Sequence, residues 1–255
     1  MRVAAVADLH CSRTSEGSFQ SLFADARRSA DVLLLPGDLT DYGLPEEANL
    51  LVAELAAAEG MPAIAVLGNH DFEAGRAEEI HGILSGAGVI VLDGDSCEIG
   101  GVGFAGVKGF AGGFGRGALG AWGEPAIKAF VQEAVNEAIK LETALARLRT
   151  ERRVVVMHYS PVAATVEGEP REIFPYLGSS RLEEPLSRYP VDVVFHGHAH
   201  RGQPEGRTLA GVPVFNVSLP LLRRTHPDGP FVRLFEIPVG DRGAAVPQEV
   251  HEVAQ

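Results

Sequence analysis

The sequence predicts an α/β protein in which short buried strands alternate with helices. Five short apolar runs are separated by segments with helical signals, and each run is continuous instead of alternating with polar residues. Continuous runs are typical of strands covered on both faces, and their alternation with helices is typical of an α/β domain. The five runs are Val3–Ala7, Val32–Leu35, Ala63–Leu67, Val154–Met157 and Val191–Phe195.

Two of the intervening helices have clear boundaries. Pro45-Glu46-Glu47 places a proline and two acids in a first helical turn, and Gly60 ends that helix. A second helix begins at Glu124-Pro125. Its apolar positions recur at helical spacing, so we expect one face to pack in the core or at an interface.

Additional strands are predicted beside the first five. Residues Val89–Val107 read as two or three short strands joined by Gly and Asp turns, and Val212–Val217 with Phe231–Val239 read as a further pair. These segments indicate an antiparallel or mixed portion of sheet. We expect one domain over residues 1–240, with a glycine-rich loop and a long helix inserted at about 106–150, and a polar tail over 241–255.

Composition narrows the class of protein. The 255 residues are 45% hydrophobic and 22% charged, as in an ordinary globular protein. A formal net charge of −12 disfavours general binding of nucleic acid. No apolar run reaches the roughly 18–20 residues of a membrane span, and the N-terminal stretch lacks the features of a signal peptide. We therefore expect a cytoplasmic protein with no membrane partner; its oligomeric state stays open.

Each of the five apolar runs is followed by side chains that bind metals or exchange protons. One Asp or His after a strand is commonly a turn or capping residue, but five such ends in one chain are poorly explained by coincidence. Because ligand sites in α/β sheets lie at the carboxyl ends of strands, we expect these residues to converge. They are Asp8, His10, Asp38, Asn69, His70, Asp71, His158, His198 and His200.

This set of side chains favours borderline divalent metals. Three carboxylate or amide oxygens with four imidazoles suit Mn, Fe, Co, Ni or Zn. Two cysteines are too few for a thiolate cluster. Seven ligands exceed what one ion takes, so we expect two divalent transition-metal ions sharing a carboxylate, with manganese the first choice.

These residues fall in five short sequence blocks. In their order along the chain, the blocks resemble the five signature motifs of the calcineurin-like metallophosphoesterase superfamily. The resemblance implies two packed mixed β-sheets flanked by helices, a four-layer sandwich, and a dinuclear phosphoesterase whose metal-bridging hydroxide attacks phosphorus. The blocks are Asp8-x-His10, Gly37-Asp38, Gly68-Asn69-His70-Asp71, His158 and Gly197-His198-x-His200.

The resemblance also implies a role for each residue. His70 would lie beside the metals and, as a cation, stabilise developing charge or protonate the leaving group. Asp71 would hydrogen-bond to His70 and orient its ring. The implied metal ligands are Asp8, His10 and His200 for one ion, Asn69, His158 and His198 for the other, and Asp38 between the two.

Three features stay open at the level of sequence. Cys11 stands where the family often has glycine, and it either lines the site or packs as a small residue beneath it. His196 precedes the last block and is not expected to be a ligand. Segment 165–180, which contains Tyr176, is either a wall of the site or a contact between subunits.

Segment 106–123 has an unusual density of glycine. It is either a mobile flap, with Lys108, Arg116 and Trp122 contacting the substrate, or a surface loop anchored by its aromatic residues. The flap interpretation and the acidic surface favour a phosphodiesterase acting on small nucleotides, cyclic or otherwise. A phosphomonoesterase or a nuclease with the same site is the alternative, and a catalytically silent protein-binding scaffold is disfavoured because every ligand position is filled.

Overall fold

The five apolar runs form strands in two different sheets. The computed structural model describes residues 1–239. The predicted polar tail, 241–255, lies outside the described residues. The first sheet has the strand order β11-β1-β2-β3-β4, with the neighbours β1 to β4 parallel and β11 antiparallel to β1. Its strands are β1 (Arg2–Ala5), β2 (Val32–Pro36), β3 (Ala63–Val66), β4 (Ile90–Val91) and β11 (Arg233–Glu236).

The second sheet holds the other two apolar runs. Its order is β5-β6-β7-β8-β10-β9, parallel from β6 to β10 and antiparallel at both edges. The mixed character predicted from the sequence is confirmed. The strands are β5 (Asp95–Ile99), β6 (Val102–Val107), β7 (Arg152–Met157), β8 (Val193–His196), β9 (Glu205–Arg207) and β10 (Pro213–Asn216).

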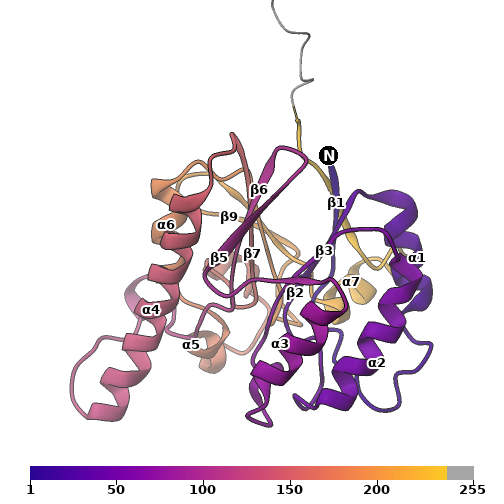
Figure 1. Cartoon of the computed structure of the whole chain (residues 1–255). Coiled ribbons are helices and arrows are strands. Elements are labelled where there is room, and N and C mark those ends of the chain that lie inside the picture. Colours follow the sequence, from indigo (N-terminus) through magenta and orange to yellow (C-terminus); the bar gives the residue numbers. More distant parts are fainter. Residues whose placement is uncertain (240–255) are drawn as a thin grey trace, which may run out of the picture.

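Helices cover the outer face of each sheet and complete a four-layer sandwich (Figure 1). Helices α1, α2 and α3 lie on the side of the first sheet, whereas α4 and α6 lie on the side of the second. No helix in residues 1–239 combines the length and apolar character needed to cross a bilayer. The helices are α1 (Gln20–Ser29), α2 (Pro45–Leu55), α3 (Ala77–Gly86), α4 (Pro125–Arg147), α5 (Phe174–Leu177), α6 (Glu183–Arg188) and α7 (Leu219–Thr225).

Strand β7 explains why its apolar run is continuous. Successive side chains of a strand point to opposite faces. Val154 and Val156 pack in the core between the sheets, whereas Val155 and Met157 pack in a second core beneath α4. The amphipathic helix predicted after Pro125 is α4, and most of its apolar stripe packs in the core, whereas Ile127 and Ile139 are exposed.

One predicted strand pair is wrong. Segments 212–217 and 231–239 do form strands, but β10 lies between β8 and β9 in the second sheet and β11 pairs with β1 in the first. Helix α7 separates the two strands along the chain. Because the two strands belong to different sheets, they are not hairpin partners.

Candidate metal centre

The two sheets meet at the carboxyl ends of their parallel strands. Just beyond β1, the amide of Ala7 donates to the carbonyl of Val217 at 2.9 Å, and the amide of Leu219 donates to the carbonyl of Ala7 at 2.8 Å. Chain segments from both sheets are therefore hydrogen-bonded at this edge. In Figure 1 the N-terminus is at the top of β1, so these strand ends point toward the bottom of the view.

The backbone is strained at this edge. Residues other than glycine seldom adopt a positive φ, because the Cβ atom then crowds the carbonyl oxygen. Among residues 1–239, the non-glycine residues with positive φ are all members of the predicted blocks: Asp8, His10, Asp38 and His198, with φ between 45° and 70°. Strain concentrated in this way is typical of a functional site.

The glycines of the blocks make room for the polar side chains. A Cβ atom on Gly68 would overlap the Asp38 carboxylate, and one on Gly197 would overlap Asp8. A Cβ on Gly37 would lie 2.5 Å from Nδ1 of His158. Each glycine is therefore needed for close approach between a loop and a side chain of another block.

A first cluster of donor atoms combines Asp8, His10 and His200, whose ligand atoms all lie within 4.8 Å of one another. Nε2 of His200 is 3.0 Å from Oδ1 of Asp8 and 3.5 Å from Nε2 of His10. Both carboxylate oxygens of Asp8 also accept from the backbone amide of His198, at 3.0 and 2.9 Å. That bond connects the end of β1 to the end of β8.

A second cluster surrounds Nε2 of His158, a fully buried side chain. This atom lies 2.9 Å from Oδ1 of Asn69, 3.2 Å from Nδ1 of His198 and 3.3 Å from Oδ1 of Asp38. The other oxygen of Asp38, Oδ2, lies 3.8 Å from Nε2 of His10 in the first cluster. Asp38 therefore presents one oxygen to each cluster.

Backbone carbonyls fix which ring nitrogens face the clusters. A carbonyl can only accept, so the ring nitrogen next to it carries the proton. Nδ1 of His158 donates to the carbonyl of Pro36 at 3.0 Å, and Nε2 of His198 donates to that of Tyr176 at 3.1 Å. The opposite nitrogen of each ring is directed at the second cluster, as in rings that bind metals.

Burial and charge shift the acidity of these groups in opposite directions. Burial disfavours a charged His158, but the Asp38 carboxylate outweighs it and raises the pKa of His158 to about 9. Burial also opposes ionisation of Asp38, yet the charge and hydrogen bond of His158 hold the Asp38 pKa well below its usual range. Burial together with the charge of His158 lowers the pKa of His198 to about 4. The metal-free cluster therefore keeps its proton on His158.

His70 lies at the open side of the site, and its side chain is 40% exposed. Its ring stands edge-on to that of His10, with centroids 4.4 Å apart. Nδ1 of His70 donates to the carbonyl of Asp41 at 2.7 Å, which leaves Nε2 for the site. The Asp41 carboxylate is also 3.4 Å from Nδ1 of His10. Asp41 was not among the residues predicted from the sequence, although it follows Asp38 by three residues.

The hydrogen bond predicted between Asp71 and His70 is wrong. Residues His70–Phe72 form a 3₁₀ helix, in which successive side chains point about 120° apart, so Asp71 faces the interior while His70 faces the site. The Asp71 carboxylate accepts from the backbone amides of Leu39, Thr40 and Gly68 at 2.8–3.2 Å and from the Thr40 hydroxyl at 2.6 Å. Burial and the charge of Asp38 raise the Asp71 pKa to about 6. Asp71 therefore joins the loops after β2 and β3.

The three predicted substrate contacts lie in different surroundings. The Lys108 carbonyl accepts from the amides of His158 and Tyr159, at 3.0 and 3.1 Å, so Lys108 is next to the second cluster. Arg116 is exposed in a short 3₁₀ helix, and the Trp122 side chain is 78% exposed. The loop that carries them is bonded to segment 175–180, for instance through Gly113. Only Lys108 is placed beside the clustered residues.

Two further residues left open by the sequence are structural in this arrangement. Cys11 is fully buried in the core, and burial raises the pKa of its thiol to about 12. His196 is also fully buried; its Nε2 lies 2.8 Å from the Thr165 hydroxyl and its Nδ1 2.8 Å from the carbonyl of Gly197. Neither residue belongs to a group that could hold a metal within residues 1–239.

Known proteins resemble this chain both in sequence, through a family model, and in fold. A family model described as calcineurin-like phosphoesterase matches residues 1–202. The fold is similar to that of phosphopantetheinyl hydrolase from Mycobacterium tuberculosis, with 17% identity over 91% of this chain and 95% of that one and a TM-score of 0.65. The protein TT1561 of Thermus thermophilus is similar at 14% identity over 86% of this chain and 90% of that one, with a TM-score of 0.54. No curated protein sequence gives a significant match.

The protein is a metal-dependent phosphoester hydrolase. It belongs to the calcineurin-like phosphoesterase family, as the resemblance of its five blocks predicted. This family depends on two metal ions, and the carboxylates and imidazoles at the converging strand ends provide groups that fit them.

Proposed function

We propose that the clustered residues bind two divalent cations with Asp38 between them. The observation that carries this proposal is the convergence on Nε2 of His158, where three acceptor atoms lie within 3.3 Å and one N–H can point at only one of them. A cation satisfies all of these donor atoms together. The proposed ligands are Asp8, His10 and His200 for one ion, Asn69, His158 and His198 for the other, and Asp38 for both.

The chain's own residues provide the remaining chemistry. When bound, the two cations supply Lewis acidity that lowers the pKa of a shared water and neutralises phosphoryl oxygens. Asp8 and Asp38 are held by backbone amides of His198 and His70, so their oxygens keep fixed directions. The Asp41 carbonyl fixes the His70 ring with Nε2 toward the site. A protonated His70 donates from this atom to the leaving oxygen.

We propose a small phosphodiester as the substrate, with nucleotide esters, cyclic or otherwise, as the first class to test. Two observations support this. A cavity beside the centre offers room for one substituent of the phosphate, and the net charge of −12 disfavours long nucleic acid. Manganese is the metal to load first, because mixed oxygen and imidazole ligands suit it.

A turnover panel with metal analysis tests the proposal. Manganese-loaded protein is given a phosphomonoester, a generic diester, 2′,3′- and 3′,5′-cyclic nucleotides, an ester of 4′-phosphopantetheine and single-stranded DNA. We expect two metal ions per chain and the highest kcat/KM on a small diester. Asp38→Asn should lose turnover and bound metal together, because it weakens the ligand common to both ions.

Asp25→Asn is the matched control, since Asp25 is an exposed residue of α1 paired with Arg28. It should keep the metal content and turnover of the wild type. Hydrolysis of the monoester alone would replace the diester proposal by a phosphatase. Equal metal content and turnover in Asp38→Asn and the wild type would contradict the metal assignment itself.

A further inference from the structure

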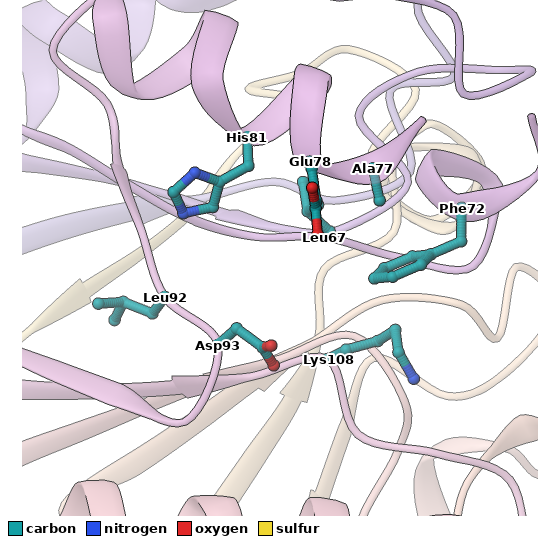
Figure 2. A pocket seen from close by; sticks show the side chains of 8 residues that line it. All are labelled: Leu67, Phe72, Ala77, Glu78, His81, Leu92, Asp93 and Lys108. Carbon is teal, nitrogen blue, oxygen red and sulfur yellow. The ribbon is translucent and has the colours of Figure 1, made fainter. Parts of the chain in front are cut away.

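A cavity of about 320 Å³ lies between helix α3 and the loops that follow β4 and β6 (Figure 2). Its volume is at the lower end of the range for small-molecule sites, about 300–1,000 Å³. Most of the exposed lining is apolar. The apolar walls are Leu67, Phe72, Ala77 and Leu92.

Several residues that line this cavity neighbour residues of the metal centre, either in sequence or through a hydrogen bond. Leu67 comes directly before the third block, and Phe72 shares a 3₁₀ helix with His70. On the other side, Lys108 accepts through its carbonyl from the amide of His158 at 3.0 Å. A phosphate held at the centre would therefore direct one of its substituents toward these walls.

Lys108 lies at the end of the cavity nearest the centre. Its ammonium donates to the carbonyl of Gly109 at 2.7 Å and lies 4.8–5.7 Å from the ring centroids of Phe72, Phe110 and Tyr159. It forms no ion pair with any carboxylate of residues 1–239; its acidic neighbours Glu137 and Asp93 pair with Lys140. Burial lowers its pKa. A half-buried cation without a carboxylate partner is suited to an anionic ligand.

Farther from the metal centre, the charged groups on the cavity walls are carboxylates instead of the Lys108 ammonium. Figure 2 shows Phe72 and Lys108 on one side of the cavity, His81 on the opposite side, and Glu78 and Asp93 on facing walls between them. Asp93 is neutralised by Lys140, whose ammonium lies 2.9 and 3.0 Å from its two oxygens. Glu78 forms no hydrogen bond or ion pair through its side chain within the described part of the chain. Its carboxylate is exposed, and it is open to a ligand as well as to water.

We infer that this cavity binds one ester substituent of the substrate, and that this substituent has an apolar body with an N–H donor directed at Glu78. Lys108 then donates to an oxygen of the phosphate between the cavity and the metals. The inference rests on the proposed phosphodiesterase function and adds the class of substituent. A nucleobase with an exocyclic amino group and an amide-containing aliphatic chain share this chemistry.

A binding experiment on manganese-loaded wild-type protein distinguishes a nucleobase from an amide-containing chain without measuring turnover. NMR titrations compare adenosine with purine riboside, which lacks only the amino group, and N-acetylethanolamine with 2-acetoxyethanol, in which the N–H is replaced by oxygen. One hydrogen bond to a charged group should favour the N–H ligand by about tenfold in Kd. The pair of ligands that shows this preference tells whether the cavity binds a nucleobase or an amide-containing chain.

Glu78→Gln should reduce the preference within that pair, because the neutral amide oxygen is a weaker acceptor than the carboxylate. Ala77→Phe should weaken binding of both ligands of the pair by about tenfold or more, because the new ring fills the cavity. Glu79→Gln is the control, since Glu79 neighbours Glu78 but is paired with Arg76 at 2.6 Å. Phe72→Leu serves as a second cavity variant if Ala77→Phe proves poorly folded. Equal Kd values within both pairs, or a preference that is undiminished in Glu78→Gln, would overturn the inference.

Turnover separates this inference from the function on which it rests. Bis(p-nitrophenyl) phosphate and adenosine 5′-(p-nitrophenyl phosphate) share a leaving group and differ in the other substituent. If adenosine is the preferred ligand, Glu78→Gln should lower the ratio of kcat/KM for the adenosine ester to that for the generic diester several-fold, because the amide oxygen is the weaker acceptor. If neither ester is hydrolysed faster than by the Asp38→Asn variant, the proposed function is rejected. If both are hydrolysed but Glu78→Gln leaves the ratio of kcat/KM values unchanged, only the inference about the cavity is rejected.

Discussion

Nε2 of His158 lies 3.2 Å from Nδ1 of His198, and the far nitrogen of each ring is held by a backbone carbonyl. Two ring nitrogens so close together repel each other unless a proton or a cation lies between their lone pairs. In the metal-free chain that proton belongs to His158, because the effect of burial is outweighed by the Asp38 carboxylate and the pKa of His158 rises to about 9. Metal binding at this position therefore displaces a proton.

His70→Ala should keep both metals and lose activity. The residue is held by the Asp41 carbonyl and stands at the exposed side of the centre. Loss of a general acid typically lowers kcat by about 10²–10⁴-fold. The loss should be larger for alkyl esters than for p-nitrophenyl esters, which need little protonation. Metal analysis beside kinetics decides the role: lost metal with unchanged turnover per bound metal would contradict it.

Gly68→Ala should impair metal binding although it adds one methyl group. The new Cβ would overlap the Asp38 carboxylate, whereas a Cβ on Gly82 of α3 meets no atom within 4 Å. Gly82→Ala should therefore leave metal binding intact and stabilise the helix by up to about 1 kcal/mol. The comparison needs manganese titrations and thermal melts of both variants. Equal manganese affinity in the two would contradict the close packing at Gly68.

Asp71→Ala should destabilise the metal-free protein by about 3–5 kcal/mol. Its fully buried carboxylate satisfies three amides and one hydroxyl of the loops after β2 and β3, and donors left unpaired in the interior cost about 1–3 kcal/mol each. Asp25→Ala, on an exposed site, should change the free energy of unfolding by less than about 0.5 kcal/mol. Urea unfolding in EDTA measures both. A loss below about 1 kcal/mol for Asp71→Ala would show that the loops do not depend on this carboxylate.

His196 should make the protein less stable in mild acid. Burial lowers its pKa from 6.5 to about 4. Between these values the unfolded chain binds a proton at His196 that the folded chain excludes, so the free energy of unfolding falls as pH decreases from about 6.5 to about 4. The full contribution is about 3 kcal/mol. Urea unfolding at pH 7 and pH 5 in EDTA should show a smaller drop for His196→Gln than for the wild type; identical drops would contradict the shift.

Much of the fold could be predicted from local sequence. The continuous run of β7 indicates burial on both faces, and Pro125 with the apolar stripe after it indicates helix α4. Strand pairing could not be predicted in the same way. β10 and β11 have similar apolar patterns, and only the packing of two sheets assigns them to different neighbours.

The sequence by itself determined which residue types follow the strands, and so the family, the class of reaction and the set of proposed ligands. Those features are local, because a strand end and the residues after it are contiguous in the chain. Only the tertiary structure decided which group touches which. Asp41 instead of Asp71 orients His70, because a 3₁₀ turn directs neighbouring side chains to different sides. The cavity between Phe72 and Lys108 likewise exists because loops distant in sequence pack side by side.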